Sequence, residues 1–258
     1  MTALFCLPAP LTAIAGNEST PLRPISNLNR NESGMVWRSV GLTNVYIVVQ
    51  VAQPWDTIAL IGSNLRSSDT IRIRSGSTAD NTVLSPSYDS GQIAAWSGVK
   101  ADNATAKTVV DAGQVRAGQF IRIDFQVAGH PDGFAQAQRL IIGQALRHEG
   151  INVDAEFTIV DQSPSYSGPN WIAYDEYPPL SQWKVKIDWI SQADFITIWQ
   201  PFLQGIGVTK PFLFVPVMGD TARYQVEAVF GSMTASVAPK HPSFNLWNIE
   251  FTQRALAP

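Results

Sequence analysis

The stretch from Trp183 to Trp189 alternates strictly between apolar and polar side chains, and this constrains the fold more than any other feature. Successive side chains of a β-strand face opposite sides, so the pattern predicts a strand with one buried face. We expect the buried face to hold Trp183, Val185, Ile187 and Trp189, and the solvated face to hold Lys184, Lys186 and Asp188.

A helix is predicted directly after this strand, over residues 191–206. Ser191 can cap its first turn, with Asp194 three residues later as the capping-box partner. Pro201 lies inside the segment and is expected to kink or shorten the helix near Gln200. The buried stripe at helical spacing comprises Phe195, Ile198, Trp199, Phe202 and Ile206.

Most of the remaining chain reads as short strands separated by turns, without interleaved helices. This pattern predicts a mainly β fold: an antiparallel jelly-roll-like β-sandwich, followed by a second, smaller β module with one short helix. The segments rich in β-branched and aromatic residues are 35–40, 45–51, 57–62, 70–74, 120–127, 140–143, 153–160, 212–217, 223–230 and 244–251.

Prolines set the expected domain boundaries. Residues 1–34 carry Pro8, Pro10, Pro21 and Pro24 and are predicted to form an extended N-terminal arm. Whether this arm lies on a neighbouring subunit or on its own domain stays open. The sandwich is expected over 35–163 and the second module over 164–258, because two prolines and a glycine make 161–169 the best linker.

Composition excludes several classes of protein. The formal net charge of −3, with basic residues scattered along the chain, argues against nucleic-acid binding. Cys6 is the single cysteine, so an internal disulfide and a cysteine metal site are excluded. Apolar runs are too short for a membrane span. The N-terminus lacks the basic start of a secretory signal, so the chain is expected to be made in the cytoplasm and not exported that way.

Catalytic signatures are lacking in the sequence. The three histidines, His130, His148 and His241, show no metal-binding spacing and no nucleophile motif stands near them. We therefore predict that the protein is not an enzyme and has no catalytic residues, no metal site and no cofactor. A glycosidase could still use two carboxylates that meet in space, such as those of 154–156 or 175–176.

Aromatic side chains beside polar loops are the better candidates for function. Trp55, Tyr88 and Trp96, together with Asp89, are the predicted ligand-binding residues. Sugars stack on aromatic rings and bond to carboxylates, and loops on a rigid scaffold commonly carry such sites. The alternative is that each aromatic ring simply closes an edge of the sandwich.

Two sets of segments resemble known proteins. The segments 37–41, 45–51, 55–65 and 70–74 resemble the opening of a discoidin-like, or galactose-binding-like, jelly roll found in bacteriophage virion proteins. The segments 140–145, 183–190, 211–216, 224–231 and 247–251 are similar to the C-terminal module of minor tail and tail-tip proteins of long-tailed phages. Together they cover about two thirds of the chain.

The resemblance implies a structural component of a phage tail tip or baseplate, located in the virion tail and made in the host cytoplasm. Its partners would be other tail proteins and further copies of itself in a symmetric assembly, with a host surface glycan as an additional contact. A carbohydrate-binding module that acts by itself is the alternative function, and a glycosidase or esterase is the third.

Overall fold

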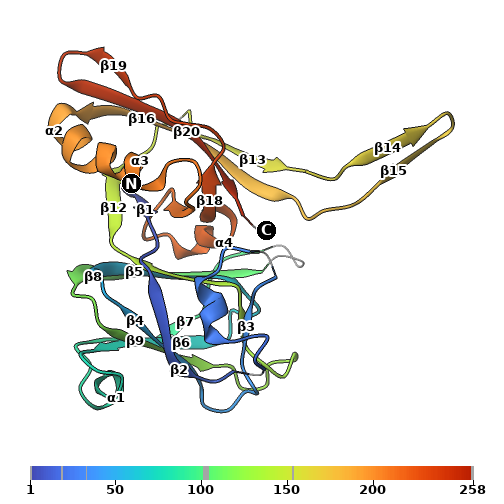
Figure 1. Ribbon diagram of the computed structural model, residues 1–258, viewed down its shortest axis with the longest axis vertical. Coiled ribbons are helices and arrows are strands. Elements are labelled where there is room, and N and C mark those ends of the chain that lie inside the picture. Colours follow the sequence, from blue (N-terminus) through green and yellow to red (C-terminus); the bar gives the residue numbers. More distant parts are fainter. Residues whose placement is uncertain (1, 19, 33, 101–104, 153, 257–258) are drawn as a thin grey trace.

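The computed structural model describes residues 2–18, 20–32, 34–100, 105–152 and 154–256, and it shows two β modules stacked on each other (Figure 1). The predicted segments also include Met1, Ser19, Ser33, Val153, 101–104 and 257–258, which lie outside the described residues. Antiparallel strand pairs dominate both modules, so the predicted mainly β fold with an antiparallel β-sandwich is confirmed.

The first module is a sandwich of a five-stranded and a three-stranded sheet. The five-stranded sheet has the order β2 (Leu11–Gly16), β4 (Val45–Val51), β9 (Phe120–Gln126), β6 (Thr70–Gly76) and β7 (Tyr88–Ala94). The three-stranded sheet has the order β11 (Arg139–Gly143), β5 (Trp55–Ser63) and β8 (Ala106–Arg116). Smaller elements are the pair β3 (Trp37–Arg38) and β10 (Gln136–Ala137), the 3₁₀ helix η1 (Ile25–Asn29) and α1 (Asn81–Leu84).

Strand β5 is buried along its whole length because its sheet is covered on both faces. Ile58 and Leu60 face the core of the sandwich, whereas Ala59 and Ile61 face a separate apolar layer shared with the second module. A strand that is buried on both faces needs no polar alternation. This explains the continuous apolar run in β5.

The second module is built on one large sheet. Its order is β12 (Ala145–Glu149), β1 (Thr2–Cys6), β17 (Phe212–Val215), β18 (Val229–Met233), β20 (Leu246–Ala255), β16 (Leu180–Ser191) and β13 (Glu156–Val160), with β19 (Lys240–Ser243) paired to β20. Leu4, Leu213 and Val215 pack towards the sandwich. Phe5, Phe212 and Phe214 pack on the opposite side, beneath the helical segment 192–206.

The prediction of an extended arm over residues 1–34 is wrong, because the described residues of this range include strands β1 and β2 and the helix η1. Strand β1 lies inside the large sheet of the second module, between β12 and β17, where Phe5 pairs with both Leu146 and Phe214. Strand β2 pairs with β4 at the edge of the sandwich. Pro8 and Pro10 lie between the two strands and mark the crossing from one module to the other. The prolines therefore interrupt strands rather than prevent them.

The predicted domain boundary at 163 and 164 also differs from the structure. The sandwich ends with β11 at Gly143, and β12 and β13 already belong to the second sheet. The expected linker leads into the hairpin β14 (Ser165–Gly168) and β15 (Trp171–Tyr174), which projects from the body (yellow in Figure 1). The segment predicted as a domain linker, 161–169, therefore contains the first strand of a projecting hairpin.

The helix predicted over 191–206 is present as α2 (Gln192–Asp194), a π-helical segment η2 (Phe195–Trp199) and α3 (Gln200–Ile206). The Asp194 amide donates to Ser191 Oγ at 3.0 Å, which confirms Ser191 as the cap, and the Asp194 carboxylate accepts from the Ser191 hydroxyl at 2.7 Å rather than from its backbone amide. The helix continues through Pro201, after the π-helical segment. Ile198, expected in the buried stripe, is exposed.

The buried face predicted for 183–189 holds for its first three apolar residues only. A β-bulge shifts the pairing between Ile187 and Ile190, and Trp189 takes a φ of +65°. Ile190 is buried in its place, and Trp189 is 74% exposed.

Two further segments depart from the predicted pattern. The strand expected over 223–230 is mostly helical: η3 (Thr221–Arg223) and α4 (Tyr224–Glu227) precede β18. Strand β8 is absent from the predicted set, although it forms an edge of the three-stranded sheet. Both segments line the pocket described below.

Candidate functional site

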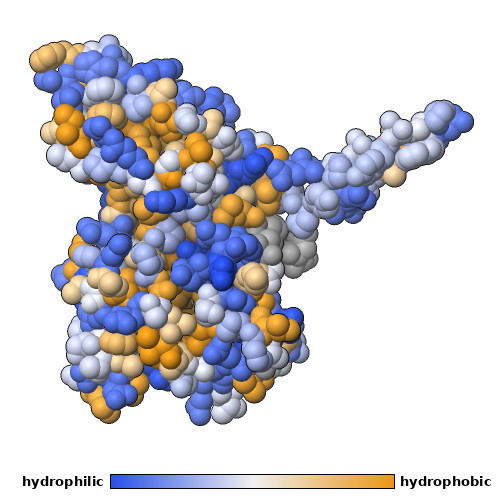
Figure 2. All heavy atoms as spheres, in the orientation of Figure 1, coloured by the Kyte–Doolittle hydropathy of each residue, from blue (hydrophilic) through white to orange (hydrophobic). Residues whose placement is uncertain are grey.

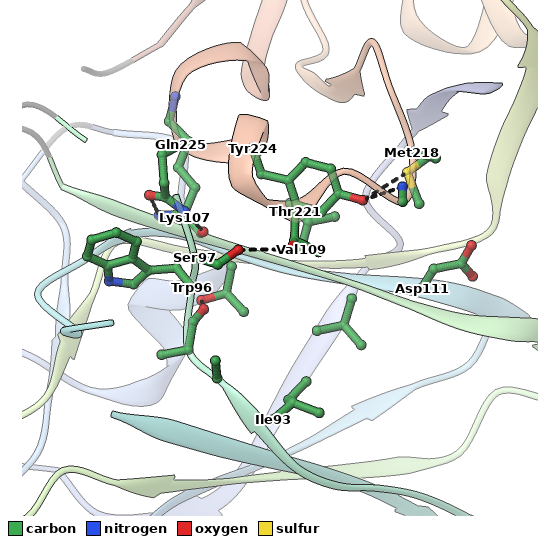
Figure 3. A pocket seen from close by; sticks show the side chains of 15 residues that line it. Ile93, Trp96, Ser97, Lys107, Val109, Asp111, Met218, Thr221, Tyr224 and Gln225 are labelled. Atoms are coloured by element: carbon green, nitrogen blue, oxygen red, sulfur yellow. Dashed lines mark hydrogen bonds between the residues drawn. The ribbon is translucent and has the colours of Figure 1, made fainter. Parts of the chain in front are cut away.

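A pocket of about 660 Å³ lies where the two modules meet (Figure 3). The sandwich contributes residues 93–97 at the end of β7 and 107–111 of β8. The second module contributes residues around 218–225, which comprise η3 and the start of α4. Neither module forms this pocket by itself.

Trp96 closes one end of the pocket (Figure 3). Its indole nitrogen donates to the carbonyl oxygen of Leu65 at 2.7 Å, which fixes the ring. Beside it, the hydroxyls of Ser97 and Thr221 lie 2.8 Å apart and join the two modules. Gly98 adopts a φ of +88° and lies so close to Ala222 that a Cβ there would be 2.0 Å from the Ala222 oxygen. The chain needs glycine at this point to bring Trp96 to the pocket.

Tyr224 forms the facing wall. Its hydroxyl accepts a hydrogen bond from the Gly219 amide at 2.9 Å and points towards the sulfur of Met218 at 3.8 Å. Burial raises the pKa of Tyr224 above its usual value, so the hydroxyl keeps its proton. Because the thioether is a weak acceptor, this O–H can donate to a ligand instead.

Gln225 holds the second module against the edge of β8. Its Oε1 accepts from the Lys107 amide at 2.9 Å, and its Nε2 donates to the Lys107 carbonyl oxygen. The Lys107 ammonium donates to the carbonyl oxygen of Ala228 at 2.8 Å. These three bonds fix the wall of the pocket, so the cleft is preorganised rather than open to rearrangement.

The other end of the pocket holds the carboxylate of Asp111. Asp111 accepts from the Arg147 guanidinium at 2.9 Å, and the same guanidinium bonds to Asp56 at 2.7 Å. Asp56 is 1% exposed and also accepts from the Ala145 amide and the Thr57 hydroxyl. Asp111 is considerably more exposed, so its carboxylate can still receive a hydrogen bond from a ligand.

The four predicted ligand-binding residues do not converge. Trp55 is fully buried and meets Tyr88 edge to face at 5.7 Å. The guanidinium of Arg116 lies 4.2 Å above the Tyr88 ring. Asp89 pairs with Arg72 on the outer face of the five-stranded sheet, and this bond lowers the pKa of Asp89 to about 2. Of the four, Trp96 alone lines the pocket.

The remaining pocket residues could not be found by the sequence pattern that identified Trp96. Lys107 and Asp111 lie on β8, and Tyr224 and Gln225 lie in a segment for which a strand was predicted. More than 100 residues of chain separate the partners Lys107 and Gln225. Only the packing of one module on the other brings them together.

The three histidines take part in other contacts. The His130 ring bonds to the backbone, with Nε2 at 2.8 Å from Asn64 O and Nδ1 accepting from the Asp132 amide. His148 packs edge to face on Trp199, and burial lowers its pKa. His241 lies beside Trp247. Within the described ranges, no three His, Cys, Asp or Glu side chains gather as a metal site, and no helix is long and apolar enough to span a membrane.

Comparisons with known proteins give distant structural likenesses. No protein-family model matches the sequence, and a search of curated proteins also finds no match. Among solved structures, the chain is similar to CBM32-3 from a family 31 glycoside hydrolase of Clostridium perfringens, with 16% identity and a TM-score of 0.34 over 52% of this chain and 90% of that one. It is also similar to chitosan-binding module 1 from a chitosanase/glucanase of Paenibacillus sp. IK-5, with 15% identity and a TM-score of 0.33 over 53% and 95%.

A third similar structure is the F-lectin (fucolectin) from striped bass serum, Morone saxatilis, with 10% identity, a TM-score of 0.37 and coverage of 97% of both chains. All these identities and scores are low. They describe a likeness and assign neither a ligand nor a function to this chain.

Proposed function

We propose that the protein is a glycan-binding protein and that the ligand enters the pocket between its two modules. One observation carries the proposal: a preorganised cleft of about 660 Å³ holds an aromatic ring at one end and hydroxyl and carboxylate groups around an otherwise apolar wall. Small-molecule sites usually measure about 300–1,000 Å³ and combine apolar walls with a few polar groups that fix orientation.

The chemistry of a sugar suits this arrangement. A pyranose ring has an apolar C–H face, which packs on an indole, and a rim of hydroxyls that donate and accept hydrogen bonds. Trp96 would receive the apolar face. Asp111 would accept from sugar hydroxyls, and the Tyr224 hydroxyl would donate to one, because its present acceptor is only the Met218 sulfur.

The test begins with an array of immobilised mono- and oligosaccharides, followed by calorimetric titration of the sugar that binds. Tyr224→Phe removes one hydroxyl, and Ala94→Trp adds bulk at a residue that lines the pocket. We expect about a fivefold weaker affinity for Tyr224→Phe, since one hydrogen bond contributes roughly 1 kcal/mol, and loss of binding for Ala94→Trp.

Tyr88→Phe is the matched control, because Tyr88 packs on Trp55 and does not line the pocket. Its affinity should equal that of the wild type. Binding that survives Ala94→Trp, or that is lost in Tyr88→Phe, would place the sugar elsewhere. If no sugar on the array binds, the proposal is refuted.

A second candidate function is a subunit of a phage tail tip or baseplate. The observation that favours it is the projecting hairpin, residues 165–174, which stands clear of the body (Figure 2). Its side chains Tyr166, Trp171, Ile172 and Tyr174 are all more than half exposed. An isolated two-stranded hairpin is only marginally stable in water, so covering these side chains with a neighbouring subunit would stabilise it.

Mass spectrometry of washed phage particles tests this second function. We expect the chain to be present in the virion at a few copies per particle. We also expect cross-linking through the hairpin to capture tail proteins as its neighbours. Absence of the chain from particles would exclude it. That the chain is not an enzyme stays a prediction, for which hydrolysis assays on the bound sugar are the check.

A further inference from the structure

A second, much smaller cavity lies between the modules and shares only Lys107 with the lining of the proposed sugar pocket. Its volume is about 20 Å³, and it is bounded by β5, β8 and β11 of the sandwich and by β18 and β20 of the second module. Phe230 and Leu256 supply part of its apolar wall. A cavity needs about 10–15 Å³ of such volume to hold one water molecule, so the occupant must be close to water in size.

Three cations line this cavity: Arg30, Lys107 and Arg139. No carboxylate is among its described lining residues. Glu32 is the acidic group whose charge acts on Arg139, and it is exposed to solvent. Arg30 is exposed, whereas Arg139 is buried and Lys107 is half-buried. Burial of a cation without a counter-charge is costly, because it removes the water that would otherwise solvate the charge.

Arg139 is 6% exposed, and its hydrogen bonds are incomplete. Its Nη1 donates to the carbonyl oxygen of Leu28 at 2.8 Å and to Asn29 Oδ1 at 3.0 Å. Its buried Nε has no hydrogen-bond partner. Buried donors without a partner are rare in folded proteins, so the Arg139 Nε calls for a ligand that accepts its hydrogen bond.

Lys107, like Arg139, is a cation whose side chain bonds only to neutral groups. Its ammonium donates to the neutral carbonyl oxygen of Ala228. Burial lowers the pKa of Lys107 to about 8 and that of Arg139 to about 10. Both shifts have the sign expected for cations that lack a counter-charge, and a bound anion would reverse them.

We propose that this cavity binds a single small monovalent anion of the halide class, such as chloride, between Lys107, Arg139 and Arg30. The anion would supply the missing counter-charge and so join the sandwich to the second module. Polyatomic anions such as gluconate are too large for a cavity of this volume. The inference does not rest on glycan binding, because the two cavities are separate apart from the shared Lys107.

The first test compares thermal unfolding of the full chain in sodium chloride and in sodium gluconate at matched ionic strength. We expect the midpoint to rise with chloride in a saturable way, and not with gluconate, since only an anion that binds the folded state stabilises it. Equal midpoints in the two salts would overturn the proposal. Crystals grown in bromide provide the second test, and an anomalous peak among the three cations is expected.

Variants separate a specific site from general screening. Lys107→Met should weaken chloride binding at least tenfold, and Arg30→Met, at an exposed position that tolerates substitution, should weaken it by a smaller factor. Lys210→Met is the matched control, since Lys210 is exposed and does not line the cavity. Unchanged halide binding in both cavity variants, or equal weakening in Lys210→Met, would overturn the assignment. Glycan titration of Arg30→Met is a separate readout and should match the wild type.

Discussion

Strand β5 and the projecting hairpin β14–β15 are both extended and both rich in strand-forming residues, yet their surroundings are opposite. All nine residues of β5 are buried. In the hairpin every residue is exposed except Gly168. Both segments contain tryptophan, isoleucine and alanine, so composition does not separate them.

The difference shows that strand propensity and burial are decided at separate levels. β5 lies in a sheet covered by the five-stranded sheet on one side and by the second module on the other. The hairpin extends the ribbon of β13 and β16 past the edge of any covering layer (Figure 1). The same kind of residues therefore stabilises the fold in one place and is available to a partner in the other.

The largest effect is expected in β1, which shares one apolar layer with β5 and packs Phe5 into a second layer on its other face. Phe5 stacks on Phe214 at 5.0 Å and meets Trp199 edge to face at 5.3 Å. Phe5→Ala should lower the free energy of unfolding by about 3–5 kcal/mol, because it leaves a cavity among aromatic rings. Urea unfolding provides the measurement. Ile14→Ala, at an exposed position of β2, is the control and should change stability by less than about 0.5 kcal/mol. If Phe5→Ala lowered the free energy of unfolding as little as Ile14→Ala does, β1 would not be part of the core.

A smaller effect is expected at the ion pairs between the modules. Arg147→Met removes the guanidinium from the buried Asp56 carboxylate and from Asp111. We expect a loss of about 1–3 kcal/mol, since an unpaired buried charge remains, although Arg147 itself is partly exposed. Adding Asp56→Asn should restore part of the loss. Lys184→Met breaks an exposed pair with Glu250 and should cost less than about 0.5 kcal/mol by the same unfolding assay. If Arg147→Met lowered the free energy of unfolding as little as Lys184→Met does, these ion pairs would not stabilise the junction between the modules.

The pH dependence of stability should reveal the buried cation. The pKa of Lys107 is lowered from 10.5 to about 8 in the folded state, so between these values the unfolded chain binds more protons there. Stability from this group therefore rises with pH across that window, by roughly 1–3 kcal/mol. The raised pKa values of Tyr88 and Tyr224 act in the opposite direction at high pH. The measurement is therefore the difference between the wild type and Lys107→Met in chloride-free buffer, and a flat difference would contradict the prediction.

The smallest effect on stability is expected in the hairpin. Trp171→Ser and Tyr174→Ser alter side chains that are 57% and 62% exposed, so the isolated chain should lose less than about 0.5 kcal/mol. If the hairpin docks on a neighbouring subunit, the same variants should reduce incorporation into particles, measured by mass spectrometry. Substantial loss of stability in the isolated chain would mean that the hairpin folds back on its own body.

Local patterns predicted much of the fold. The strand 45–51 coincides with β4, and Ser191 caps the helix that its capping box indicates. Trp189 shows the limit of this reasoning, because the β-bulge that exposes it depends on how β16 pairs with β20. β1 shows another limit, since prolines at 8 and 10 concealed a strand of only five residues.

The candidate site was less predictable than the fold. Trp96 could be chosen because it lies near polar turns, but Trp55 and Tyr88, chosen by the same reasoning, pack on each other inside the sandwich. Tyr224 and Gln225 carry no signal, because their role arises only when α4 packs on β8.

The sequence by itself determined that this chain forms antiparallel β-sheets with one helical segment, because alternation, turn residues and capping act over a few neighbouring residues. Only the tertiary structure decided that β1 joins the second module, that β5 is covered on both faces, and that Lys107 and Arg139 line a cavity between the modules that has no carboxylate among its described lining residues. These features depend on contacts between segments far apart in the chain. No local pattern encodes them, since each requires one whole module to pack on the other.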